Sequence, residues 1–116
     1  MIEKVISQVE FEIGQIDQLL ESYVELFERA KADIPNMVDI TALGSVLHSF
    51  YNGLENIFLT LAKRIDQKVP KTTQWHRDLL NQMTKTESKR RQVLSTDMAH
   101  RLADLSTFIF VFSGVG

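Results

Sequence analysis

The sequence predicts an all-α protein, folded as an antiparallel up-and-down helical bundle of about four helices, two of them long. Two observations support this prediction. Apolar residues recur at steps of three and four along most of the chain, which is the spacing of an amphipathic helix. The two prolines, Pro35 and Pro70, fall between the periodic stretches, where they would end helices. A chain of 116 residues can build one domain with a single core, so residues 1–116 are predicted to form one domain.

The first helix is predicted from an unbroken 4-3-4-3 spacing of apolar residues. These are Ile2, Ile6, Val9, Ile13, Ile16, Leu20, Tyr23, Phe27 and Ala30. One helix of about 30 residues would be roughly 45 Å long, whereas a compact domain of this size has a radius of gyration of about 13 Å. We therefore expect an elongated bundle, or a helix that extends into a partner. Gly14 has a low helix propensity and should destabilise this helix. We expect another helix to approach closely at this residue.

The central helix, residues 40–68, carries two stripes of different character. An apolar ladder suited to a core consists of Leu43, Leu47, Phe50, Leu54, Phe58, Leu61 and Ile65. The adjoining stripe holds small or hydrogen-bonding residues, namely Gly44, His48, Tyr51, Asn52 and Glu55. A solvated helix would carry Lys and Glu there, so we expect this second stripe to face something polar. Asp39 is the predicted N-cap, and Pro70 is the predicted end.

Two shorter helices are expected after Pro70. Thr72 or Thr73 caps the first, whose apolar side is Trp75, Leu79, Leu80 and Met83. Residues 84–92 are polar and basic without periodicity, which predicts a mobile connecting loop. Ser95 caps the last helix, whose core stripe is predicted to be Met98, Leu102, Leu105, Phe108 and Phe112. After Thr107 the sequence FIFVFSGVG is apolar on every side of the predicted helix. If it were exposed, it would be a hydrophobic patch prone to aggregation.

Composition and targeting signals exclude several classes of protein. The absence of cysteine excludes disulfides, a thiolate zinc site and a cysteine nucleophile. The N-terminus contains acids and no apolar block, so it does not have the pattern of a signal peptide. The longest apolar run, residues 108–115, is far shorter than the roughly 20 residues that span a bilayer. We expect a soluble, cytoplasmic protein that does not bind membranes.

The net charge of −2 conceals an uneven distribution of charge. Residues 1–33 have a charge of −5, and residues 63–101 have a charge of +6. A basic half can attract a polyanion, which makes four residues candidates for contacting RNA: Lys85, Lys89, Arg90 and Arg91. The alternative is that these charges only form solvated helix faces and a loop, because no aromatic residue interleaves the KRR run.

Residue chemistry alone identifies no active site. The three histidines, His48, His76 and His100, fall on three different predicted helices, and the sequence has no Glu-x-x-His pair. It also has no glycine-rich phosphate loop and no nucleophile elbow. We predict no metal site and no cofactor, and a metal-binding bundle remains the weakest of the alternatives.

Three stretches nevertheless resemble a known family. They are LHSFYNGLENIF at 47–58, WHRDLLNQMT at 75–84 and LADLSTF at 102–108, and in order and spacing they resemble the HepT-like branch of the HEPN superfamily. The resemblance implies a HEPN-like bundle that forms a homodimer and is the toxin of a toxin–antitoxin module. It implies a nucleotidyltransferase antitoxin as partner and metal-independent RNA cleavage. The polar side chains of the central helix, with His76, would then line the cleft: His48, Tyr51, Asn52, Glu55 and His76.

The sequence departs from the family where catalysis is expected. The family uses an Arg-x4-6-His motif, in which arginine stabilises phosphate charge and histidine transfers a proton or orients the ribose hydroxyl. In the HepT branch, the antitoxin modifies a tyrosine two residues after that histidine. Here these positions hold Ile109, Gly114 and Gly116, and no Arg-x4-6-His occurs elsewhere in the chain. The resemblance thus predicts an inactive chain that lacks the family's C-terminal end.

Two explanations for this tail remain open at the level of sequence. One is an inactive relative that keeps the scaffold and its partner surface. The other is a truncated or frame-shifted product, which we favour because an exposed FIFVF segment should be selected against. The alternative function is a non-catalytic helical dimerisation or interaction module that binds a nucleotidyltransferase or another protein.

Overall fold

The computed structural model of the chain describes residues 2–113, with side chains described up to Ile109. It contains the helices α1 (Ile2–Ser22), α2 (Val24–Ala32), α3 (Met37–Leu61), η1 (Ala62–Asp66), α4 (Trp75–Met83) and α5 (Thr96–Ser113). All are α-helices except η1, which is one turn of π-helix continuing α3. The described residues form no β-strand, only an isolated bridge between Glu87 and Arg90. The predicted all-α bundle is confirmed.

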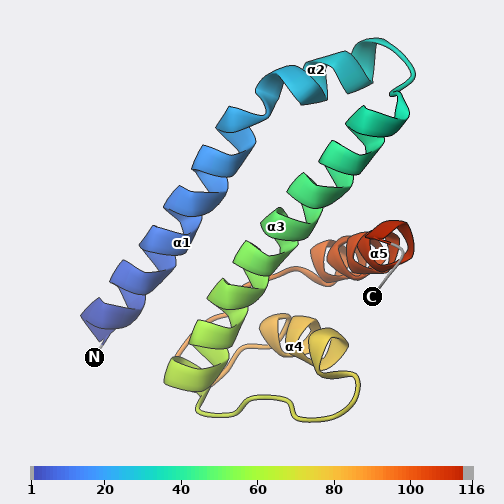
Figure 1. Ribbon diagram of the computed structural model, residues 1–116. Helices are drawn as coiled ribbons and strands as arrows, with labels where there is room; N and C mark the ends of the chain where they lie inside the picture. Colours follow the sequence, from blue (N-terminus) through green and yellow to red (C-terminus); the bar gives the residue numbers. More distant parts are fainter. Residues whose placement is uncertain (1, 114–116) are drawn as a thin grey trace.

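The helices form a long hairpin with a smaller layer on one side of it (Figure 1). α1 and α3 lie side by side, and α2 bends across the top to join them. α4 and α5 pack against each other and against the C-terminal half of α3, away from α1. α5 is seen nearly end-on where α3 runs lengthwise, so it crosses the hairpin steeply. The molecule measures 47 × 29 × 24 Å, which confirms the predicted elongation.

The first helix is broken where the sequence predicted continuity. Tyr23 separates α1 from α2 with φ −116° and ψ 20°, outside helical geometry. The hydroxyl of Ser22 donates to the carbonyl oxygen of Gln18 at 2.8 Å, an i−4 bond that bends helices. The prediction of one helix of about 30 residues is therefore wrong. Apolar periodicity continues through the break and does not reveal it.

Only part of the predicted apolar ladder of α1 is buried. Of this ladder only Ile16 is buried within α1, whereas Ile2, Ile6 and Ile13 are about half exposed; the other buried residue of α1, Val5, was not part of the predicted ladder. The reason is that α1 packs mainly against α3, and no other described helix lies along its length (Figure 1). A stripe of apolar side chains is left on the surface.

The close approach of α1 and α3 takes place at Gly53 and not at Gly14. A Cβ atom at Gly53 would lie 2.8 Å from Cγ1 of Ile16, whereas a Cβ atom at Gly14 would meet nothing within 4 Å. Gly53 thus lets the two long helices approach at their centre. The expectation placed on Gly14 is wrong.

The ends of α3 differ in detail from the prediction. Asn36 is the N-cap, and its Oδ1 accepts a hydrogen bond from the backbone N–H of Asp39 at 2.8 Å. Asp39 itself pairs with Arg29 across the α2–α3 connection, at 3.3 Å. At the other end, Gln67 takes a left-handed conformation with φ 59° and closes η1 before Pro70 is reached.

The last helix begins where it was predicted to begin, but the side of the helix that is buried differs from the predicted one. Ser95 Oγ accepts a hydrogen bond from the backbone N–H of Met98 at 3.0 Å, which confirms the cap. The buried side chains of α5 are Ala99, Leu102 and Ile109, whereas Met98 and Phe108 are 44% and 46% exposed. The small Ala99 faces the neighbouring helices, so the predicted core stripe is shifted by one residue at Met98 and Phe108. Phe112 lies outside the described side chains.

The segment 84–92 is anchored by a buried ion pair. Arg90 Nη2 and Nε donate to the two carboxylate oxygens of Asp66 at 2.6 and 2.7 Å, and the Asp66 side chain is fully buried. The Arg90 guanidinium also donates to the carbonyl oxygens of Gln82, Lys85 and Arg91. The expected mobile loop is therefore fixed to the end of α3.

Candidate functional site

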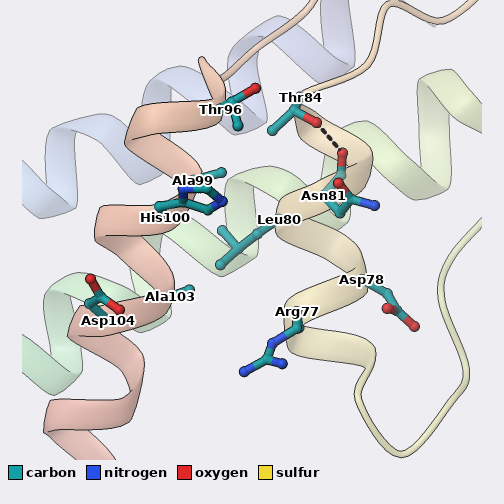
Figure 2. Close-up of a pocket in the computed structure, with 10 residues that line it drawn as sticks. All are labelled: Arg77, Asp78, Leu80, Asn81, Thr84, Thr96, Ala99, His100, Ala103 and Asp104. Atoms are coloured by element: carbon teal, nitrogen blue, oxygen red, sulfur yellow. Dashed lines mark hydrogen bonds between the residues drawn. The ribbon is translucent and has the colours of Figure 1, made fainter.

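Two adjoining cavities lie between α4 and α5, and the smaller one also reaches α3. The inner pocket has a volume of about 230 Å³ and is lined by Tyr51, Gln74, His76, Arg77, Leu80, Ala103, Ser106 and Thr107. The outer pocket, of about 460 Å³, is lined by Arg77, Asp78, Leu80, Asn81, Thr84, Thr96, Ala99, His100, Ala103 and Asp104 (Figure 2). Both share Arg77, Leu80 and Ala103.

Tyr51 is the deepest polar residue of the inner pocket. It extends from the middle of α3, is only 6% exposed, and its hydroxyl has no hydrogen-bond partner of normal geometry among the described residues. Burial raises the pKa of the Tyr51 phenol; the nearby Ser106 hydroxyl opposes that rise, and the Glu55 carboxylate adds to it. The phenol is therefore a neutral donor at physiological pH.

Glu55 and His76 form a pair at one side of the inner pocket. Glu55 lies one turn after Tyr51 on α3, and its buried carboxylate contacts Nδ1 of His76 in the first turn of α4. The imidazole also stacks on the ring of Trp75, with ring centroids 3.6 Å apart. These two contacts fix the ring and leave Nε2 as the nitrogen that is not engaged by Glu55.

The inner pocket also lies at the N-terminus of α4. Gln74 is the N-cap residue but makes no side-chain capping bond, and His76 and Arg77 occupy the first turn. Thr72 stands in for a cap: its hydroxyl accepts from the backbone N–H of Gln74 at 3.2 Å and donates to Asp78 at 2.7 Å. The predicted capping role of Thr72 or Thr73 is thus replaced by this turn before the helix. The backbone N–H groups of the first turn of α4 lie at the positive end of the helix dipole.

The outer pocket is bounded by facing side chains of α4 and α5. In Figure 2, Arg77 and Leu80 point from α4 towards α5, and His100 points from α5 towards α4. Asp78 points away from the gap. Arg77 makes no ion pair with any residue in the described part of the chain. A guanidinium and an imidazole thus face an open space between two helices.

The predicted cleft residues are brought together only in part. Tyr51, Glu55 and His76 meet around the inner pocket. His48 lies further towards the start of α3, in a separate groove with Met37 and Ile40, and Asn52 lines a groove between α1 and α3. The stripe identified in the sequence thus turns around α3 and faces three different surroundings.

The four basic residues proposed for RNA also differ in their surroundings. Lys85, Lys89 and Arg91 are exposed on the segment 84–92. The Arg90 side chain is 9% exposed and fully engaged with Asp66 and backbone carbonyls. An RNA-contacting role therefore remains a proposal for the three exposed residues, while Arg90 has an internal partner.

Sequence reasoning missed Arg77, Ser106 and Thr107 as site residues. Arg77 follows His76 directly, and the pair at the start of a short helix was a signal that could have been followed. Ser106 and Thr107 belong to the LADLSTF stretch, but only the crossing of α5 over α3 places them beside Tyr51. The periodicity of residues along one helix cannot reveal a contact between two helices, such as the one between α5 and Tyr51 of α3.

Ile109, which the resemblance predicted to occupy the family's arginine position, is part of the core. Ile109 is 8% exposed and packs in the same apolar cluster as Phe58, Leu79 and Leu102. Gly114 and Gly116, which the resemblance predicted to occupy the histidine and tyrosine positions, lie outside the described residues. Within the described part of the chain, no cluster of three His, Asp or Glu residues is arranged to hold a metal ion.

Comparison with known families decides the assignment. A family model described as HepT-like protein matches residues 42–113, more than half of the chain. The chain belongs to the HepT-like family, within the HEPN superfamily. The match begins in the first turns of α3 and runs through α5, so this HepT-like chain carries both pockets within the matched region. Comparisons with curated proteins and with solved structures found no match. None of the described helices is long and apolar enough to cross a bilayer.

Proposed function

We propose that this chain is the HepT-like component of a HEPN/nucleotidyltransferase toxin–antitoxin module, and that it is inactive as a ribonuclease. The proposal rests on the family match over residues 42–113. The inactivity rests on Ile109: an isoleucine occupies the arginine position of the family motif and lies in the apolar core. An apolar side chain cannot stabilise the charge that develops on a phosphate during cleavage.

A cleavage assay tests the inactivity. The purified chain is incubated with a mixed-sequence RNA in the presence of EDTA, because the family reaction is independent of metal. We expect no cleavage above the level of a heat-denatured control. Cleavage that follows the protein peak through two chromatographic steps would show that another set of residues is catalytic.

The antitoxin pairing has its own test. The chain is co-expressed with the nucleotidyltransferase encoded beside it and purified through a tag on one of the two proteins. We expect a stable complex in gel filtration. Failure of the two proteins to co-purify, or the absence of any neighbouring nucleotidyltransferase gene, would contradict the module assignment.

A second candidate function is a non-catalytic helical interaction module. It is favoured by the apolar side chains that the hairpin leaves exposed, which include Ile6 and Ile13 on α1 and Met37 and Val38 on α3. Exposed apolar residues clustered on one face mark interaction surfaces in soluble proteins. A complex with a protein other than a nucleotidyltransferase, together with no RNA binding, would favour this second function.

A further inference from the structure

A stripe of apolar side chains on α1 lies beside the side of the helix that contacts α3. Ile2, Ile6 and Ile13 are 59%, 51% and 46% exposed. The half-buried Leu20 follows Ile13 at the same seven-residue step that separates Ile13 from Ile6. Residues four and seven apart lie on one side of a helix, so these four residues form one continuous surface, here called the α1 stripe. At about 1.5 Å per residue it is about 27 Å long.

A column of acidic residues runs along the α1 stripe. Glu3, Glu10 and Asp17 are exposed and follow one another at steps of seven residues. Each precedes a residue of the stripe by three positions, which makes it a neighbour on the helix surface. None of the three forms an ion pair with another described residue. Lys4, the only basic residue of α1, is two positions from Ile6 and therefore lies across the helix.

This combination selects among the partners that could cover the stripe. RNA and anionic lipid carry charge of the same sign as the acidic column and would be repelled. In an antiparallel pair of α1 helices from two copies of the chain, each flank of one helix would meet the same flank of the other. The acidic columns would then face each other, and like charges in such positions are destabilising.

We propose that the α1 stripe binds an amphipathic helix of a partner protein, with basic residues along one flank of that helix. Its apolar side would cover the isoleucines, as in other complexes where a helix binds through apolar residues at steps of three and four. Its Lys or Arg residues would pair with Glu3, Glu10 and Asp17. Charge complementarity supports this choice, because the column is acidic over its whole length and has no partner within the described structure.

This inference does not rest on the toxin–antitoxin assignment. α1 lies outside residues 42–113, which match the family, and the proposal holds whether the partner is a nucleotidyltransferase or another protein. A missing nucleotidyltransferase or unexpected RNA cleavage would leave it standing. Failure of a basic helix to bind α1 would leave the module assignment standing.

Fluorescence anisotropy of a labelled synthetic peptide tests the surface. The probe is a helical peptide of about 21 residues, long enough to cover the stripe, with leucine at the a and d positions of each heptad, lysine beside them and alanine elsewhere. One control peptide replaces lysine by glutamate, and a second has the same composition with its leucines spread around the helix. The full chain is titrated into each peptide.

We expect the basic amphipathic peptide to bind with a dissociation constant below about 100 μM at about 150 mM salt. It should bind at least about tenfold more tightly than either control, because each control lacks one of the two complementary features. No binding of the basic peptide, or equal binding of the peptide with spread leucines, would overturn the proposal.

Two pairs of matched variants locate the binding to the α1 stripe. Ile6→Ser and Glu10→Gln should each weaken binding of the basic peptide by about threefold or more. Phe11→Ser changes a side chain that is 62% exposed and lines the groove on the other side of α1, and Glu25→Gln removes an exposed acid on α2. Both controls should leave binding unchanged. Equal effects within either pair would mean non-specific attraction and would overturn the site.

Two further measurements accompany these variants. Circular dichroism melts check that each variant is folded, which we expect because the substituted side chains are at least half exposed or charged. Light scattering measures the mass of Ile6→Ser, which should equal that of the wild type. A fall in mass for Ile6→Ser would assign the α1 stripe to a second copy of the chain and would overturn the proposal.

Discussion

Among the ion pairs of the described residues, the pair of Asp66 and Arg90 has the most buried side chains. The Asp66 side chain is fully buried and receives hydrogen bonds from Arg90 and from Gln82 Nε2. The pair ties η1 at the end of α3 to the segment that leads into α5. Removal of one partner leaves the other charge buried and unpaired, which is far more costly than loss of a surface pair.

We expect Asp66→Ala to reduce the free energy of unfolding by about 3–5 kcal/mol. The matched control is Asp97→Ala, which removes the carboxylate of an exposed i,i+4 pair with Arg101 on α5. That surface pair is expected to contribute less than about 1 kcal/mol. Urea denaturation followed by circular dichroism measures both. Equal losses in the two variants would show that burial of the Asp66 pair has no special effect on stability.

The same pair predicts how stability changes in acid. Burial by itself would raise the pKa of Asp66, but the hydrogen bonds from Arg90 and Gln82 and the charges of Arg90 and Lys68 lower it below its usual value of 3.8. A lowered pKa in the folded state means that this contribution to stability is complete above the unfolded pKa. It is lost as the pH falls through the folded pKa.

The measurement compares the wild type with Asp66→Asn from pH 7 to pH 2.5. The stability difference between them should be constant down to about pH 4 and should shrink at lower pH, as Asp66 becomes protonated in the wild type. A difference that is already shrinking between pH 7 and pH 5 would contradict a lowered pKa.

At the scale of the helices, one glycine of α1 and one of α3 provide a direct comparison. Gly14 and Gly53 both lie inside helices, where replacement by alanine normally gains about 1 kcal/mol. At Gly14 the new methyl group meets nothing within 4 Å, so Gly14→Ala should gain this amount. At Gly53 it would meet Cγ1 of the buried Ile16 at 2.8 Å, and the strain should outweigh the gain.

Thermal melts of the two variants should therefore shift in opposite directions. Gly14→Ala should melt above the wild type, and Gly53→Ala below it. The same substitution in the same type of helix isolates the effect of the helix–helix contact. A rise in melting temperature for both variants would mean that α1 and α3 can separate at Gly53 without cost.

These helices also show what the sequence can and cannot predict. The existence of α3 and the Ser95 cap follow from local signals, namely apolar periodicity and a capping residue, and both are confirmed. The break at Tyr23 leaves the apolar spacing unchanged, and the close approach at Gly53 depends on which face of α1 meets α3. Apolar periodicity along one segment shows neither feature. Tyr51, Glu55 and His76 could be predicted to share a cleft, and Arg77 could have been added because it follows His76 directly. Ser106 could not be predicted, because only the packing of α5 on α3 places it beside Tyr51.

At the scale of the whole molecule, one half of the hairpin has no second layer. α4 and α5 cover only the C-terminal half of α3 (Figure 1). The opposite end of the hairpin carries exposed apolar side chains. Among them, Met37 and Ile40 line a groove of about 530 Å³ along the N-terminal half of α3, which also contains Gly44 and His48. A homodimer, as proposed from the family, would bury this surface.

We expect the chain to be a dimer at micromolar concentration, with a mass of twice 13.3 kDa in light scattering coupled to gel filtration. Ile40→Glu should give a monomer, because it places a charge in the groove. It should not unfold the chain, since an acid in the first turn of a helix is favourable. Phe11→Glu, an equally large change on the exposed side of α1, should leave the dimer intact. A monomeric wild type would refute the dimer, and dissociation by Phe11→Glu with no effect of Ile40→Glu would move the interface from the α3 groove to α1.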